Sequence, residues 1–305
     1  MSNTLPFIEE RRTLGATGLA VSPIGFGGAP LGIEGYLTTE DRESDAFEDE
    51  AIRAIHMALD CGINLFDTAP AYGEGRSERL IGRALEGKRD RAVITTKYTP
   101  RLDATPEEWQ ASFDASLARL KTDHVDVLQL HGGYYSDEFG EELASSGILD
   151  WAQEQKAAGK ARFVGLTAEN SSTCLESLIK TKRFDTLQIA FNVINQSHCD
   201  YSRADQEKLT GVIPLARSLG LGILVMRSTT CGFLGALLAT QFPEIAPVEA
   251  IRLALRFILS VKEVDCALIG MLDRDIVRAN AELVVDRANR LDVVALHNRF
   301  PRERQ

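Results

Sequence analysis

The sequence predicts an α/β protein, a closed (β/α)₈ TIM barrel with an N-terminal β-hairpin cap, and three observations support this fold class. Short apolar, β-branched runs alternate with longer segments of helical period, which is typical of parallel strands joined by crossover helices. The alternation repeats eight times at an even spacing. No linker rich in Pro, Gly or Ser interrupts it, which favours one barrel domain over residues 1–305 rather than an open doubly wound sheet.

The period of the apolar residues locates each element. The eight expected strands are short apolar runs at residues 20–26, 64–68, 92–97, 125–131, 162–167, 186–192, 222–227 and 266–271. The eight expected helices lie at residues 50–59, 77–85, 106–120, 148–158, 173–182, 209–219, 248–260 and 273–284. Gly15 and Gly18 are placed to turn a hairpin that caps the lower barrel mouth. Long connections at residues 31–49, 132–147 and 228–247 follow strands, so we expect them to cover the substrate.

Charge and composition argue against several classes of function. The 305 residues include 44 acidic and 34 basic side chains, a formal charge of −10, so general binding to nucleic acid or to an anionic membrane is not expected. The five cysteines are scattered and lack CxxC spacing, which fits neither a disulfide framework nor a zinc cluster. No segment has the roughly 18 consecutive apolar residues of a membrane span, and the first residues lack the apolar run of a secretory signal, so we expect no export by a standard signal. We expect a cytoplasmic protein, a monomer or a small homo-oligomer.

Four polar residues lie at or just after the ends of the second, third and fourth expected strands: Asp67, Tyr72, Lys97 and His131. In a barrel these strand ends converge on one mouth, where catalytic groups lie. A buried lysine needs a carboxylate partner, so we expect Asp67 to orient Lys97, whose ammonium lowers the pKa of Tyr72 from its usual value of about 10. Tyr72 can then donate a proton to a carbonyl oxygen as hydride arrives at the carbon, while a neutral His131 hydrogen-bonds that oxygen. The set predicts interconversion of carbonyls and alcohols.

The segments around these residues resemble the aldo-keto reductase superfamily. They read FDTAPAYG, TTKYT and VDVLQLHGG, preceded by LGATGLAVSPIGFGG, and the likeness extends over nearly the whole chain. The resemblance implies a barrel enzyme that uses NADPH or, less often, NADH, without metal or flavin. It places the family's catalytic tetrad on Asp67, Tyr72, Lys97 and His131. The polar first and fourth loops favour a small carbonyl or sugar-like substrate.

The resemblance also implies contacts to the cofactor. Gln188 matches the glutamine that holds the nicotinamide carboxamide. Thr167 keeps the hydroxyl of the family's Ser-Asn pair, and Asn170 is a candidate for the amide that Ala168 lacks. The residues after the seventh strand resemble the pyrophosphate loop, with hydroxyl groups in place of its usual Pro, Leu and Gly. The candidates there are Met226, Arg227, Ser228, Thr229, Gly232 and Leu234, of which Arg227 is able to contact either the cofactor or an anionic substrate.

The remaining cofactor positions lie after the first and eighth strands. The resemblance assigns Gly270, Met271, Asp273, Arg274 and Asn280 to the adenosine end, and Gly28, Ala29 and Asp67 to the barrel mouth. Arg274 is able to bind a 2′-phosphate, whereas Asp273 and Asp275 repel one, so NADP(H) and NAD(H) both stay open.

Several residues have a second, purely structural interpretation. Gly28 serves either the cofactor or close packing. Tyr134, Tyr135 and Phe139, in the loop after His131, either line the pocket or anchor their own loop.

Two alternative functions remain. Lys97 could form a Schiff base in a lyase, although the carboxylate of Asp67 argues against a neutral amine. A nicotinamide-redox-sensing binding protein of the same superfamily, similar to its channel-associated β-subunits, would also keep the tetrad.

Overall fold

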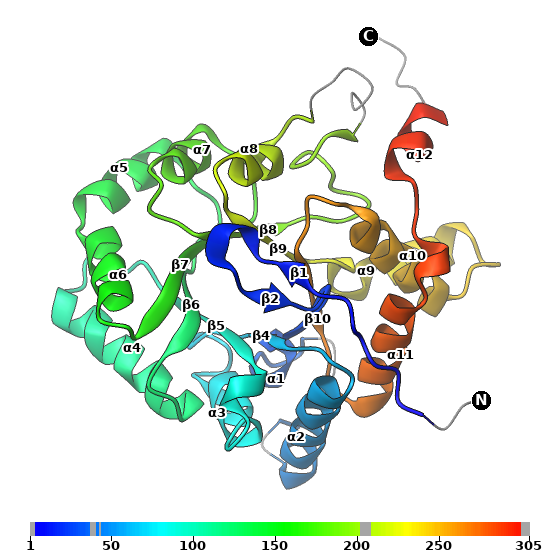
Figure 1. The fold of residues 1–305 in the computed structure, drawn as a ribbon, viewed down its shortest axis with the longest axis horizontal. Coiled ribbons are helices and arrows are strands. Elements are labelled where there is room, and N and C mark those ends of the chain that lie inside the picture. Colours follow the sequence, from blue (N-terminus) through cyan, green and yellow to red (C-terminus); the bar gives the residue numbers. More distant parts are fainter. Residues whose placement is uncertain (1–3, 37–40, 43, 202–208, 300–305) are drawn as a thin grey trace.

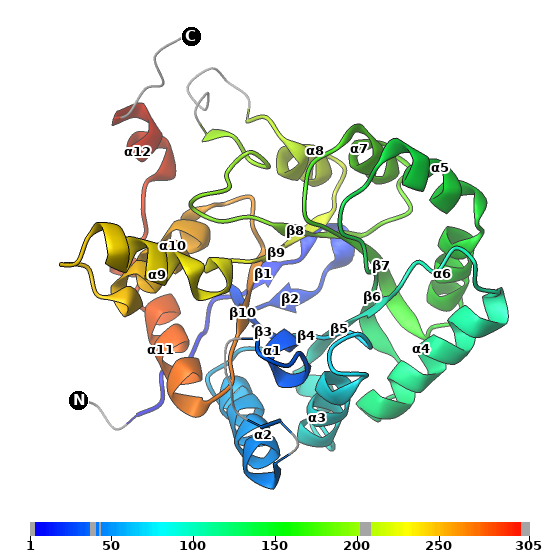
Figure 2. The same cartoon turned by 180° about the vertical axis from the view of Figure 1, so that it is seen from behind.

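A computed structural model of the chain describes residues 4–36, 41–42, 44–201 and 209–299. Within these residues, eight parallel strands form a closed barrel in the order β10-β3-β4-β5-β6-β7-β8-β9, with helices packed around it (Figures 1 and 2). The predicted (β/α)₈ barrel is confirmed. No helix in the described ranges is both long enough and apolar enough to span a bilayer.

The barrel strands lie close to the predicted positions. They are β3 (Ile24–Gly27), β4 (Leu65–Asp67), β5 (Val93–Tyr98), β6 (Val125–Leu130), β7 (Ala161–Ala168), β8 (Thr186–Ala190), β9 (Gly222–Met226) and β10 (Cys266–Gly270). The prediction for the first strand, residues 20–26, was wrong at its start, because Ala20 and Val21 belong to the hairpin and the barrel strand begins at Ile24. Pro23 separates the two, since it has no backbone N–H with which to continue a ladder.

The predicted hairpin cap is also confirmed. Strands β1 (Arg12–Thr13) and β2 (Ala20–Val21) pair antiparallel around the 3₁₀ turn η1 (Gly15–Thr17), in front of the barrel in Figure 1. Gly15 has φ +52°, and a Cβ there would overlap the backbone of Gly222, so glycine allows the turn to sit directly on the barrel.

Helices form the outer layer. Eight of them match the predicted ones: α2 (Asp45–Asp60), α3 (Arg76–Ala84), α4 (Pro106–Leu120), α6 (Ile148–Ala157), α7 (Thr173–Lys180), α8 (Val212–Ser218), α10 (Pro247–Ser260) and α11 (Arg274–Val285). The local sequence explains their starts. Thr105 and Glu108 form a capping box at α4, with Pro106 in the first turn. Helix α2 begins five residues before the predicted start, because the side chain of Ser44 accepts a hydrogen bond from the Phe47 N–H.

The long connections contain short helices that the sequence did not predict. They are α1 (Ala29–Gly32), α5 (Asp137–Ser145), η4 (Thr230–Gly232) and α9 (Phe233–Gln241). Outside these connections lie η2 (Arg89–Arg91), η5 (Arg287–Asn289) and α12 (Val293–Arg299). Helix α5 is short and mostly polar, with Phe139 and Leu143 as its only large apolar residues, and the side chain of Ser136 caps its start. Residues 37–40 and 43 of the first connection lie outside the described residues.

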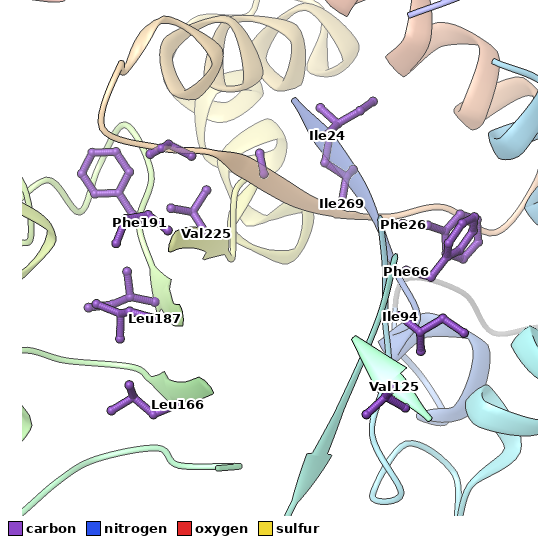
Figure 3. Packing of buried hydrophobic residues seen from close by; sticks show 14 of the residues in the cluster. Ile24, Phe26, Phe66, Ile94, Val125, Leu166, Leu187, Phe191, Val225 and Ile269 are labelled. Carbon is purple, nitrogen blue, oxygen red and sulfur yellow. The ribbon is translucent and has the colours of Figure 1, made fainter. Parts of the chain in front are cut away.

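Side chains along each strand alternate between two environments. Those that face the helices, among them Phe26 and Phe66 with ring centroids 5.7 Å apart, build the large core between strands and helices (Figure 3). Those that face the barrel axis change in kind along a strand. In β5 the sequence of inward residues is Val93, Thr95 and Lys97, from an apolar lower end to a charged upper end. The charged inward side chains, and with them the candidate site, therefore lie at the upper end of the barrel.

Candidate active site

The four residues predicted to carry the chemistry meet in one pocket. Asp67 ends β4, Lys97 lies near the end of β5, and His131 directly follows β6. Tyr72 lies in the connection between β4 and α3. All four line a cavity of about 250 Å³ at the carboxyl ends of the strands.

An ion pair between Asp67 and Lys97 forms the floor of this pocket. The Nζ atom of Lys97 lies 2.7 Å from Oδ1 of Asp67, and both side chains are at most 5% exposed. Lys97 also donates to the carbonyl oxygen of Thr68 at 2.8 Å. Burial lowers the pKa of Lys97, but the charge of Asp67 and the contacts with Tyr72 raise it more, so the net direction is upward. Lys97 is therefore held as an ammonium.

Tyr72 lies against this ammonium. The Nζ atom of Lys97 is 4.9 Å from the centre of the Tyr72 ring, and the His131 ring meets it edge-on with centroids 5.9 Å apart. Burial raises the pKa of Tyr72, and the charge of Lys97 lowers it by less, so the pKa is above its usual value. The expectation of a lowered pKa was wrong for this reason: it counted the ammonium and not the loss of solvent. Tyr72 keeps its proton at neutral pH and is suited to donate it.

His131 is neutral, as the chemistry requires. Burial, and then the nearby positive charge of Lys97, lower its pKa from 6.5 to about 4. A neutral imidazole can donate one hydrogen bond to an oxygen in the pocket without competing with Tyr72 as an acid.

A layer of polar residues beneath the pocket was missed by the sequence reasoning. The Nε2 atom of Gln129 donates to Oε1 of Gln188 at 2.9 Å and lies 3.3 Å from Oδ1 of Asp67. The hydroxyl of Thr95 donates to the same Asp67 oxygen at 2.7 Å. The alternation of inward residues in β5 and β6 could have identified Thr95 and Gln129, because each lies two residues before a predicted catalytic residue, Lys97 or His131, on the same side of its strand.

The candidate cofactor residues fall into two groups. The pocket is lined by Ala29, Asp67, Thr167, Gln188, Met226, Arg227 and Gly270. The pocket lining does not include Gly28, Asn170, Ser228, Thr229, Gly232, Leu234, Met271, Asp273, Arg274 or Asn280. The cavity thus brings Thr167, Gln188 and the residues at the end of β9 together with the tetrad, whereas Asn170 and most candidates for the phosphates and the adenosine lie outside its lining.

Some members of the second group have evident structural partners. A Cβ at Gly28 would overlap Ser77 Oγ and the carbonyl oxygen of Asp67, which favours the close-packing interpretation of this glycine. Ser228 is buried and donates to the carbonyl oxygen of Leu268 at 3.3 Å. Leu234 and Met271 are buried.

The hydroxyl of Thr167, expected to face the nicotinamide, is bonded within the protein. It donates to the carbonyl oxygen of Gly132 at 2.9 Å and accepts from the Gly132 N–H at 3.0 Å. Tyr135 donates to the carbonyl oxygen of Thr167 at 2.9 Å and is 3% exposed, so it anchors the loop after β6 and is not part of the pocket lining. Tyr134, in contrast, is exposed.

Two polar side chains, Gln188 in the pocket lining and Asn170 just outside it, fit a nicotinamide carboxamide. Among the described residues, the Nε2 atom of Gln188 reaches only a sulfur, Sδ of Met226 at 3.7 Å, which is a weak acceptor. The Oδ1 atom of Asn170 is buried and has no protein partner there. A carboxamide needs one donor for its oxygen and one acceptor for its N–H groups, and these two side chains supply one of each.

The loop after β9 has strained backbone. Arg227 and Thr230 have φ values of +56° and +53°, which residues other than glycine seldom adopt, and Gly232 has φ +81°. Such conformations concentrate at ligand sites. Three backbone N–H groups of the loop are bonded within it: those of Thr230 and Gly232 donate to the carbonyl oxygens of Arg227 and Thr229, and that of Leu234 donates to the Thr230 hydroxyl.

An ion pair across the pocket mouth was also missed. Arg227 binds Glu169 through two hydrogen bonds, Nε to Oε2 at 2.6 Å and Nη2 to Oε1 at 2.7 Å. Both residues line the pocket, so the pair connects the ends of β7 and β9 beside the tetrad. Glu169 follows β7 directly, and its position at a strand end was the signal that could have identified it.

The three long connections contribute unequally. Ile33 and Tyr36 of the first and Gly132 of the second line the pocket, with Pro30 just before the first. No described residue of the third is part of that lining. Within the described ranges, no group of three or more His, Cys, Asp and Glu side chains is arranged to bind a metal ion.

Comparison with known sequences places this geometry in a family. The sequence profile of the Aldo/keto reductase family matches residues 23–292. The chain is a member of this family of oxidoreductases. Two relatives of this chain are named for sugar chemistry. L-galactose dehydrogenase of Arabidopsis thaliana is 30% identical over 91% of this chain and 88% of its own length. The 6-dehydroglucose reductase of Novosphingobium aromaticivorans is 30% identical over 74% of each chain.

Comparison with solved structures agrees on the fold. An aldo/keto reductase from Klebsiella pneumoniae, solved in complex with NADP and acetate, superposes with a TM-score of 0.69. The superposition covers 97% of both chains at 19% sequence identity.

Proposed function

We propose that this protein is an NAD(P)H-dependent oxidoreductase that interconverts a small carbonyl compound and its alcohol by direct hydride transfer. The observation that carries the proposal is the convergence of Tyr72, the buried Asp67–Lys97 pair and a neutral His131 on one pocket. Each group has the protonation state that the reaction needs before the chemistry begins, which is the electrostatic preorganisation that makes active sites efficient.

The roles follow from the geometry. The bound nicotinamide supplies hydride for reduction or accepts it in oxidation. In the direction of reduction, Tyr72 gives its hydroxyl proton to the carbonyl oxygen and becomes a phenolate, which the ammonium of Lys97 stabilises. Asp67 keeps Lys97 charged and in place, and His131 orients the carbonyl oxygen by a hydrogen bond. In oxidation, the phenolate of Tyr72 takes the proton from the alcohol.

The cofactor is proposed to lie along the mouth of the barrel. Gln188 and Asn170 would hold the carboxamide, and the loop from Met226 to Leu234 would hold the phosphates through those backbone N–H groups that its own turns do not use. Gly270 and the segment to Asn280 would hold the adenosine end. Both NAD(H) and NADP(H) are compatible with these residues.

The substrate is proposed to be a small polar carbonyl or a sugar-like alcohol. The Glu169–Arg227 pair offers both acceptors and donors at the pocket wall, which suits a molecule with several hydroxyl groups. The names of the two sugar-related relatives support the same class.

The raised pKa of Lys97 disfavours the Schiff-base alternative. A lysine attacks a carbonyl only as the free amine, and the carboxylate at 2.7 Å holds this one as ammonium. Borohydride trapping with a candidate aldehyde or ketone is expected to leave Lys97 unmodified.

Location and partners remain proposals. Cys61, Cys174, Cys199 and Cys266 are free and buried, as expected of a cytoplasmic protein. No partner other than the cofactor and a small substrate is proposed, and the protein is proposed to be a monomer or a small homo-oligomer.

The test combines binding and turnover. Calorimetric titration with NADH and NADPH, followed by assays of a panel of aldoses, sugar alcohols and simple aldehydes, is expected to show tight binding and turnover of at least one polar substrate. Binding without any turnover would favour the redox-sensing protein. Absence of binding to both the reduced and oxidised cofactors would overturn the proposal.

A further inference from the structure

Carboxylates of this chain occupy the start of helix α11. The Oδ1 atom of Asp273 accepts a hydrogen bond from the backbone N–H of Ile276 at 2.8 Å. Glu50 reaches across from α2, which lies beside α11 in Figures 1 and 2, and its Oε1 atom accepts from the backbone N–H of Arg274 at 3.3 Å. These are two of the N–H groups that a helix start offers to an anion, and both are already bonded.

The guanidinium of Arg274 is bonded to the same carboxylate. Its Nε lies 2.9 Å from Oε1 of Glu50 and its Nη2 lies 3.2 Å from Oε2. This two-pronged geometry is the one with which arginine binds a phosphate group. Arg53, on the next turn of α2, also donates to Glu50, at 3.0 Å. Burial raises the pKa of Glu50, but the hydrogen bonds from Arg274 and Arg53 lower it more, so the carboxylate is ionised at neutral pH.

The charges around this helix start do not favour a further anion. Glu50, Asp273 and Asp275 contribute three negative charges, against the two positive charges of Arg53 and Arg274. A 2′-phosphate brings about two more negative charges. To reach the fork of Arg274 it has to displace Glu50, whereas a ribose 2′-hydroxyl can donate a hydrogen bond to a carboxylate.

We propose that Glu50 is a specificity-determining residue that makes this protein prefer NAD(H) to NADP(H), because it holds Arg274 and fills the start of α11. This inference rests on the proposed function, in which the segment from Gly270 to Asn280 binds the adenosine end of the cofactor. The sequence left open whether Arg274 binds the 2′-phosphate of NADP(H). In this inference Arg274 is instead paired with Glu50 within the protein. Glu50 acts on the choice of cofactor and takes no part in the transfer of hydride or proton.

The test measures dissociation constants by calorimetric titration with NADH and NADPH, independently of any substrate. The wild-type protein is expected to bind NADH at least about tenfold more tightly than NADPH. Glu50→Gln keeps the size of the side chain and removes its charge, which releases Arg274. We expect this variant to bind NADPH at least about tenfold more tightly than the wild type does, while its affinity for NADH changes by less than about threefold.

Two further variants locate the effect. Glu48→Gln makes the same charge change on the same helix, where the carboxylate pairs with Arg83, and it is expected to leave the ratio of the two affinities unchanged. Glu50→Gln combined with Arg274→Ala is expected to lose the gain in NADPH binding. Both side chains of the Glu50–Arg274 pair are partly exposed, so these variants are expected to fold, which thermal unfolding checks.

Each outcome decides the matter. Tighter binding of NADPH than of NADH by the wild-type protein overturns the inference and leaves the proposed function standing. The inference is also overturned if Glu50→Gln leaves the ratio of the NADH and NADPH affinities unchanged, or if Glu48→Gln shifts that ratio by as much as Glu50→Gln does. Binding of neither nucleotide to the wild-type protein overturns the proposed function itself.

Discussion

The two mouths of the barrel are built by the same eight strands and hold opposite kinds of side chain. At the lower mouth, Leu14, Leu19 and Val21 of the hairpin region pack against the inward residues at the strand starts. At the upper mouth, Asp67 and Lys97 form a buried ion pair beneath an open pocket. The lower mouth is closed by apolar contact, and the upper mouth keeps charge in a place that is almost free of solvent.

Within the barrel strands, the inward residues that stabilise the fold therefore lie at the lower end and those proposed to carry the chemistry lie at the upper end. Burial of apolar surface at the lower mouth stabilises the fold without any directional requirement. The upper mouth contains an ion pair whose desolvation costs about as much as its attraction returns, so it is a poor source of stability. Substitutions at the two mouths should therefore have different signatures, and four predictions test this.

The largest expected effect is on catalysis at the upper mouth. Tyr72→Phe removes the proton donor and keeps the ring against Lys97, so we expect kcat/KM to fall by about 10²–10⁴-fold. The Tm and the affinity for cofactor should change little, because one hydroxyl is lost. Tyr134→Phe, at an exposed tyrosine outside the pocket lining, is the control. Turnover by Tyr72→Phe close to that of the wild type would contradict the assigned role.

At the lower mouth the expected effect is on stability. Leu14 is fully buried between the hairpin and the barrel, so Leu14→Ala should lower the free energy of unfolding by about 2–5 kcal/mol. Urea unfolding measures this change. The kcat/KM per folded molecule should stay within about twofold of the wild type, since the pocket lies at the other mouth. A loss of activity as large as that of Tyr72→Phe would show that the two mouths are not independent.

The pH dependence of stability should depend on His131. Its pKa is about 4 in the folded protein and 6.5 in an ordinary environment, so the unfolded chain takes up the proton first as the pH falls. The free energy of unfolding therefore decreases from about pH 6.5 to about pH 4, by about 1–2 kcal/mol once the partial exposure of the ring is allowed for. Above pH 6.5 the contribution is constant.

His131→Gln should remove this slope, which is measured as the difference between variant and wild type in urea unfolding at pH 7 and pH 4.5. His124→Gln, at a partly exposed position, should keep it. An unchanged slope in His131→Gln would contradict the buried, neutral imidazole.

The smallest expected effect concerns the ion pair at the pocket mouth. Arg227 and Glu169 are 48% and 21% exposed, so Glu169→Gln should change the free energy of unfolding by less than about 1 kcal/mol. We expect KM for a polar substrate to rise by about three- to tenfold with kcat nearly unchanged, which steady-state kinetics measures. Glu176→Gln breaks a surface pair with Lys180 and should leave both constants unchanged. A fall in kcat with a constant KM would assign Glu169 to the chemical step instead.

The sequence predicted the features that depend on local periodicity. The strands were found because their apolar runs are short and bounded, and the four tetrad positions follow from the rule that barrel strands end at one mouth. The buried Asp67–Lys97 pair was expected from the cost of an unpaired buried charge.

Features that depend on contacts between distant segments were not predicted. Glu50 and Arg274 are 224 residues apart, and no local pattern relates them. The same holds for Glu169 and Arg227, 58 residues apart. The net direction of the Tyr72 pKa shift was missed because the depth of burial is a property of the folded chain.

The contact between Gly15 and Gly222 bears on how a mutational scan of this protein would be interpreted. A side chain at Gly15 would overlap the backbone of Gly222, and one at Gly222 would overlap Leu14. Nearly every substitution at either glycine should therefore lift the hairpin from the barrel. Both positions would score as intolerant as Tyr72, although they lie at the opposite mouth. In such a scan, intolerance to substitution would mark both the hairpin cap and the catalytic pocket. Activity measured per folded molecule would then distinguish residues that stabilise the fold from residues that take part in the reaction.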